Sequence, residues 1–199
     1  MPKPDPQTRL ADAAFRLLVE ISWADLTLAS VARAAGVSPA DLLEAAPSKP
    51  ALLGVMLRRL SGELARRYRP DRESHSARDR IFDVCMTWFG LQKSRKKAMR
   101  ALYNGLSRDP PALLSVRREF FAAAEWILAL GEADAGPALR VRAAILAGLI
   151  VRAMPVWLAD DDEMGKTMAQ LDRDLRRAEK LLWPRGTTKK KRRPTSRKR

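Results

Sequence analysis

The chain has 199 residues, of which 46% are hydrophobic and 31% charged, and it carries a formal net charge of +15. This apolar content suffices for a buried core and excludes a wholly disordered chain. The single cysteine (Cys85) and single histidine (His75) exclude an intramolecular disulfide, a multi-cysteine metal site and a His-based catalytic triad. We therefore expect no enzyme, no catalytic or metal site and no cofactor. The first residues lack the apolar stretch of a secretory signal and no run of about 18 apolar residues occurs, so we expect a cytoplasmic protein.

The spacing of apolar residues predicts an all-α fold. Apolar side chains recur every three to four positions and do not alternate with period two. In the first third of the chain, Thr27 and Ser38 are good N-cap residues, whereas Gly36 and Pro47 stop helices. These signals predict helices over residues 6–21, 27–35, 38–46 and 48–68.

Longer helices are expected in the rest of the chain. A polar segment at 69–78 reads as a loop, and proline, glycine and acidic runs mark the later breaks. The last helix has an apolar stripe from Met164 to Leu182 whose spacings alternate between four and three, which is typical of packing against another helix. These longer helices are expected over residues 78–91, 94–107, 110–130, 137–158 and 162–183.

The positive charge is unevenly distributed. Residues 1–50 carry a net charge of −1, residues 51–100 carry +8, residues 101–184 carry −1, and residues 185–199 carry +9. We expect the basic C-terminal tail to be disordered, because it can bury nothing and repels itself. The tail is either a solubilising end or a non-specific contact for phosphates, on nucleic acid or on an anionic membrane surface.

The segment from Leu10 to Leu53 resembles the TetR family of bacterial repressors. The matching pieces are AAFRLL at 13–18, LTLASVA at 26–32, AGVS at 35–38 and PSKPALL at 47–53. The resemblance implies a three-helix helix-turn-helix head at 6–60 on a larger antiparallel helical body at 61–184. It also implies a homodimer formed through the last helices, double-stranded DNA as partner, and a small apolar effector bound in the body.

The resemblance implies a set of DNA-binding residues, with one marked departure in the third helix. Side chains in that helix normally reach base edges, but here the corresponding positions hold no basic residue and two acidic residues, Asp41 and Glu44. We expect Asp41 to cap the helix and Glu44 to be solvated. The implied DNA-binding residues are Thr27, Arg33, Ser38, Ala40, Leu43 and Lys49.

Large side chains at helical spacing occur in the body. They belong either to an ordinary core or to a lined cavity for an apolar ligand. The candidate pocket residues are Trp88, Met99, Tyr103, Phe120 and Trp126.

Two segments of the body, WLADD at 157–161 and TMAQLDR at 167–173, are similar to TetR-like accessory proteins of coenzyme Q biosynthesis. That resemblance implies an isoprenoid ligand and a head that no longer recognises an operator. A basic cluster at residues 93–100 is either a solvated face or a contact for phosphates or for the acidic residues 160–163. The leading interpretation is a TetR-type DNA-binding transcriptional regulator, and the alternative is a lipid-binding or partner-binding protein with the same fold.

Overall fold

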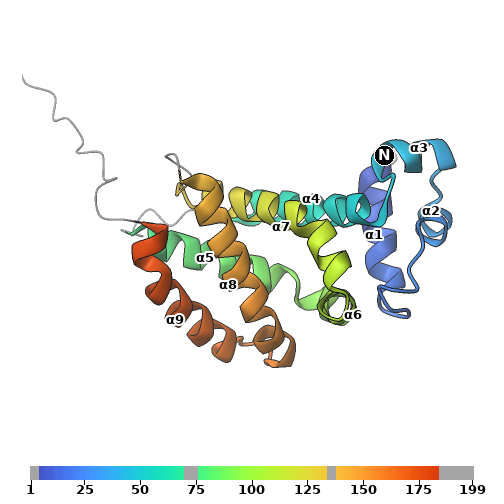
Figure 1. Cartoon of the computed structure of the whole chain (residues 1–199). Coiled ribbons are helices and arrows are strands. Elements are labelled where there is room, and N and C mark those ends of the chain that lie inside the picture. The colour runs from blue at the N-terminus through green and yellow to red at the C-terminus, as the bar shows by residue number, and fades with distance from the viewer. Residues whose placement is uncertain (1–4, 70–75, 134–137, 184–199) are drawn as a thin grey trace, which may run out of the picture.

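The computed structural model describes residues 5–69, 76–133 and 138–183, and all regular structure within these residues is helical (Figure 1). The all-α prediction is confirmed. The basic tail, expected to be disordered, lies outside the described residues. The elements are α1 (Pro6–Leu17), α2 (Leu28–Ala35), α3 (Pro39–Ala45), α4 (Lys49–Arg67), α5 (Ala77–Leu91), the short 3-10 helix η1 (Lys93–Arg95), α6 (Lys96–Ser107), α7 (Pro110–Leu130), α8 (Leu139–Ala159) and α9 (Gly165–Leu182).

The head is formed by α1, α2 and α3, and local capping residues determine where α2 and α3 begin and where α2 ends. Thr27 and Ser38 cap α2 and α3 through hydrogen bonds that their side chains accept from Ser30 and Asp41 N–H groups. Gly36 ends α2 with φ of 60°, a left-handed conformation that favours glycine. These boundaries agree with the predicted ones, but α1 ends at Leu17 rather than at residue 21 because the chain turns over residues 18–20.

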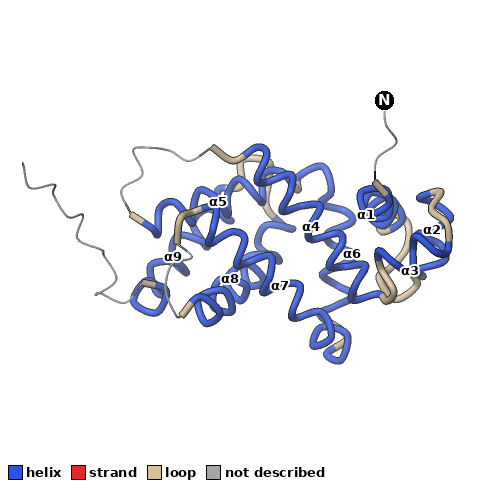
Figure 2. The backbone as a smooth tube through the Cα atoms, turned by 90° about the horizontal axis from the view of Figure 1, so that it is seen from above, coloured by secondary structure: helices blue, strands red, loops and turns tan. Residues whose placement is uncertain are grey.

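Helix α4 connects the head to the body without a break. It begins at the N-cap Ser48 and packs against α1 at one end and against α7 along its length (Figures 1 and 2). Its buried side includes Leu52, Met56, Leu60 and Leu64. The boundary expected between residues 60 and 61 therefore lies inside a continuous helix that both parts share.

The body is an antiparallel arrangement of α5, α7, α8 and α9, with α6 between it and the head (Figures 1 and 2). Its centre is aromatic: the Phe89 and Trp157 ring centroids are 5.6 Å apart, and those of Trp88 and Phe89 are 5.0 Å apart. Cys85 is fully buried there, and burial raises the pKa of its thiol to about 12, so it packs as a small apolar residue.

Helix α8 is largely apolar, although it also carries Arg140, Arg142 and Arg152. Within the described part of the chain it is the one helix long and apolar enough to cross a membrane, and it packs against α7 and α9. Burial against these neighbours covers one side of α8 only. Several small or apolar residues stay exposed along the opposite side: Val141, Ala144, Gly148, Val151 and Ala159. The exposed Arg152 lies among them, and its Nε is 3.2 Å from Asp174 Oδ2 on α9.

The basic cluster before α6 binds the end of α8. The Lys96 ammonium donates a hydrogen bond to the Asp160 carbonyl at 2.6 Å and lies 5.4 Å from the centre of the Trp157 ring. Lys93 and Arg100 donate in the same way to the carbonyls of Asp162 and Leu158. Three cations thus meet carbonyls at and just after the C-terminus of α8. Of the two readings left open, contact with residues 160–163 is met through their carbonyls, and these three cations are not simply solvated.

Candidate nucleic-acid interface

Helix α3 forms the exposed end of the head. None of its residues is buried, and the Leu43 side chain is 68% exposed. Ala40, also exposed, lies one turn earlier on the same side of the helix. In Figure 1 α3 lies at the far end of the molecule from α9, so its outer side is open to a partner as large as a duplex.

Thr27 and Ser38 have their hydrogen-bonding groups engaged in capping. The Thr27 N–H donates to Ser30 Oγ at 3.2 Å, and Thr27 Oγ1 accepts the Ser30 N–H at 3.1 Å. The Ser38 hydroxyl donates to Asp41 Oδ2 at 2.8 Å. The Thr27 N–H is therefore not available to a phosphate, whereas the first N–H groups of each helix still lack an intrahelical acceptor.

Lys49 joins the start of α4 to the loop after α1. Its ammonium donates to the carbonyls of Trp23 at 2.6 Å and Ala24 at 3.2 Å, and lies 4.9 Å from the Trp23 ring centre. Partial burial lowers the pKa of Lys49, although the carboxylates of Asp25 and Asp109 act in the opposite direction. Because an ammonium has three N–H donors, one remains for a phosphate after the two carbonyls are satisfied.

The other cations of the head differ in whether they are free to contact a phosphate. Arg33 is exposed on α2, and its guanidinium makes no hydrogen bond or ion pair with the described residues. In contrast, Arg9 donates to the Gly36 carbonyl at 2.8 Å and Arg16 donates to the Ala34 carbonyl at 3.2 Å, so both neutralise the C-terminus of α2. The sequence did not reveal this role, because the partners lie 18 to 27 residues away.

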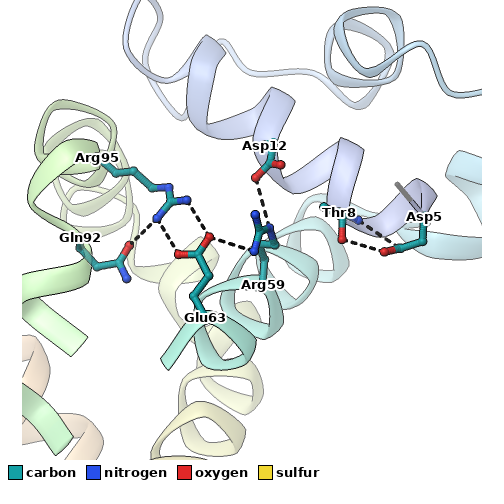
Figure 3. A network of polar contacts seen from close by, with 7 residues as sticks. All are labelled: Asp5, Thr8, Asp12, Arg59, Glu63, Gln92 and Arg95. Atoms are coloured by element: carbon teal, nitrogen blue, oxygen red, sulfur yellow. Dashed lines mark hydrogen bonds and ion pairs between the residues drawn. The ribbon is translucent and has the colours of Figure 1, made fainter. Parts of the chain in front are cut away.

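A polar network fixes the head on the body (Figure 3). Both oxygens of Glu63 accept hydrogen bonds from the Arg95 guanidinium at 2.8 Å, and Glu63 Oε1 lies 2.9 Å from Arg59 Nη1. Arg59 Nε in turn lies 3.3 Å from Asp12 Oδ1 on α1. Charged groups from α1, α4 and η1 are thereby joined in one chain of contacts.

The body contains an apolar cavity of about 130 Å³ between α4, α5, α6, α7 and α8. Four of the candidate pocket residues line it: Trp88, Met99, Tyr103 and Phe120. Trp126 does not, because it lies on the outer side of α7 with 56% of its side chain exposed. The sequence missed several further lining residues, which have the same helical spacing as ordinary core: Leu57, Leu102, Ile127 and Met154.

Comparison with solved structures shows the fold. A TetR transcriptional regulator from Rhodococcus sp. RHA1 aligns with a TM-score of 0.59 and 17% identity, over 92% of this chain and 98% of that one. A TetR-family transcriptional regulator from Streptomyces coelicolor aligns with a TM-score of 0.53 and 22% identity, over 92% of this chain and 83% of that one. No family model and no curated protein matches the sequence. The resemblance to coenzyme Q accessory proteins is not confirmed.

Proposed function

We propose that this chain, which has the fold of TetR-family transcriptional regulators, is a cytoplasmic DNA-binding regulator of transcription. The observation that carries the proposal is the exposure of α3 at the free end of the head, where neither the body nor another helix covers Ala40 or Leu43. A recognition helix must be clear of the body to enter a major groove. Burial of this helix would have made the proposal untenable.

Phosphate contacts would orient the head on the duplex. Arg33 offers an uncommitted guanidinium, and Lys49 offers its third N–H donor. Thr27 and Ser38 lie at the starts of α2 and α3, where unpaired N–H groups and the helix dipole favour an anion.

Base recognition in this proposal relies on apolar contact rather than on arginine. Ala40 and Leu43 are suited to the methyl group of thymine, and the exposed Glu44 carboxylate can accept a hydrogen bond from the amino group of cytosine. Asp41 is held by the Ser38 hydroxyl and is not needed for recognition. A head with these residues would make modest contacts per half-site.

A homodimer would double those contacts. The exposed apolar side of α8 supports a second copy of the chain as its occupant, because small residues such as Ala144 and Gly148 let two helices approach closely. Two heads related by a two-fold axis would bind half-sites about one helical turn apart, or a multiple of it. The tail at 185–199, with its charge of +9, would add affinity that does not depend on sequence.

The cavity in the body supports a small apolar effector. Its volume of about 130 Å³ is close to the ~150 Å³ of an apolar cavity that takes benzene. An isoprenoid chain would need the surrounding helices to move apart. An effector here would contact α4 and α6, the two helices through which the head meets the body.

One observation favours the alternative function, a lipid-binding or partner-binding protein of the same fold. The outer side of α3 carries two acidic residues, the half-buried Asp41 and the exposed Glu44, and no basic residue. Carboxylates close to phosphates oppose DNA binding.

Titration of the DNA upstream of the chain's own gene separates the two functions. The full chain and a version lacking residues 185–199 would each be titrated over a salt series, with a scrambled duplex as control. A regulator should keep its preference for one duplex after truncation, with a smaller dependence on salt because fewer phosphates are neutralised. Loss of all DNA affinity on truncation would show that the head does not bind DNA.

A further inference from the structure

A groove of about 820 Å³ lies between the head and the body. It is distinct from the apolar cavity of the body. The turn that follows α1 forms one wall with the apolar side chains of Leu18, Ile21 and Trp23. Helix α6 and the start of α7 form the other wall, and both views place α6 beside the head (Figures 1 and 2). The groove therefore has one largely apolar wall on the side of the head, and one wall whose polarity and charge depend on the side chains of α6.

One side of α6 faces this groove along almost its entire length. The residues on it recur at spacings of three and four, so that they form a single stripe. Of the two small residues in the stripe, Ala101 leaves space for a ligand and Gly105 accommodates Trp23, and the remaining ones are hydrogen-bond donors or cations. The stripe consists of Lys97, Arg100, Ala101, Asn104, Gly105 and Arg108.

The cations in this stripe are largely uncommitted. Among the described residues, Lys97 and Arg108 make no ion pair or side-chain hydrogen bond, and Arg100 gives one N–H to the Leu158 carbonyl. Two carboxylates also border the groove, Glu20 and Asp109, and Asp109 Oδ1 accepts the Ala112 N–H at the start of α7. Positive groups thus outnumber negative ones on the side that α6 provides.

We propose that the groove is a second binding site, which takes a small anion with an apolar body. A carboxylate or phosphate would accept charge-assisted hydrogen bonds from Lys97, Arg100 and Arg108. The apolar body would lie against the half-buried Val19 and Ile21 on the opposite wall, where burial of apolar surface adds to the affinity. The mixed lining distinguishes this site from the body cavity, which has no cation among its lining residues.

A ligand in the groove would touch the head and the body together. Gly105 already packs closely on Trp23, since a Cβ at that position would lie 2.5 Å from Trp23 Cβ. An occupant beside this contact would fix the angle between the head and α6. This consequence for DNA affinity rests on the proposed function, but binding itself does not.

Isothermal titration calorimetry with decanoate, decyl phosphate and decanol tests the site on the full chain. Both anions should bind, and decanol should bind at least roughly tenfold more weakly because it lacks the charge. The double variant Lys97→Glu/Arg108→Glu should weaken anion binding by roughly tenfold or more. The control Arg67→Glu/Arg117→Glu changes the net charge equally on exposed residues outside the groove, and should bind the anions as the unmodified chain does.

A second variant tests the place of binding without changing charge. Ser115→Trp puts a large side chain on an exposed position of the groove wall, and it should abolish anion binding while the thermal midpoint stays unchanged. The proposal is overturned if neither anion binds, or if Ser115→Trp and the charge reversals leave anion binding unaffected. It is also overturned if the reversals lower affinity for duplex DNA alone, because the cations would then contact phosphates of the duplex.

Discussion

At the scale of single residues, Glu63 joins η1 to α4 at the centre of the polar network. It accepts two hydrogen bonds from Arg95 at 2.8 Å and forms an ion pair with Arg59 at 2.9 Å, and only 17% of its side chain is exposed. Arg95 also lies 5.5 Å from the Phe15 ring centre, so it contacts the head directly. Removal of the Glu63 charge would leave two partly buried guanidinium groups without their shared partner.

Glu63→Gln should lower the free energy of unfolding by about 1–3 kcal/mol, since a partly buried charged group loses its partner while the shape is kept. Urea denaturation followed by circular dichroism measures this difference. Glu179→Gln on the exposed surface of α9 is the matched control, and it should change the free energy by less than about 0.5 kcal/mol. Equal values for the two variants would show that the network in Figure 3 does not stabilise the head on the body.

Sequence reasoning at this scale succeeded where the partner was near in the chain. Thr27 and Ser38 were predicted as N-caps, and in the structure each accepts a hydrogen bond from the third residue after it. It failed for Lys49 and Arg9, whose partners are carbonyls 25 to 27 residues away. A cation on a helix surface gives no sign in the sequence of whether it meets solvent, phosphate or a helix end.

At the scale of the elements, α6 makes contacts at both of its ends that its amphipathic pattern did not predict. Cations at and just before its N-terminal turn bind the end of α8, and Gly105 near its other end packs on Trp23 of the head. Helix α6 is therefore, beside α4, a cavity-lining helix that contacts the head directly. The periodicity correctly predicted a helix over 94–107, but spacing alone could not reveal its neighbours at either end.

Gly105→Ala should destabilise the junction of head and body, because the new Cβ would lie 2.5 Å from Trp23 Cβ. Such overpacking costs about 1–3 kcal/mol, more than the gain in helix propensity of about 1 kcal/mol. Chemical denaturation measures the change in unfolding free energy.

Gly62→Ala in α4 is the control for this prediction. Its new Cβ would meet nothing closer than the Arg66 guanidinium at 3.5 Å, so the variant should be neutral or more stable than the parent. If Gly105→Ala is as stable as Gly62→Ala, then the contact between α6 and Trp23 is looser than the structure indicates.

At the scale of the whole molecule, the exposed side of α8 requires an explanation. A largely apolar helix is normally buried on its apolar sides, yet Val141 is 60% exposed in the single chain. A second copy of the chain packed on this side would bury the exposed apolar residues of α8. The sequence had suggested dimerisation from the stripe on the last helix, but that stripe is mostly buried inside the protomer, where Leu171, Leu175 and Leu182 pack.

Gly148→Glu should convert the dimer into a monomer. The position is exposed and a Cβ added there would have nothing within 4 Å, so the single chain should fold unchanged, whereas a carboxylate buried between two copies is costly. Sedimentation velocity should give a mass near 22.3 kDa for the variant and twice that mass for the parent. Ala122→Glu, exposed on α7, is the control and should remain dimeric; dissociation of both variants, or of neither, contradicts the proposed interface.

The central claim is that α3 recognises DNA although it carries no basic residue. Selection of bound sequences from a random duplex library measures this directly, with the full chain and with Leu43→Glu compared at the same salt concentration. The parent should enrich one sequence with two related half-sites about one helical turn apart or a multiple of it. Leu43→Glu should enrich none while keeping weak, salt-sensitive binding through its basic residues. Enrichment of no sequence by the parent, or of the same sequence by the variant, would contradict the claim.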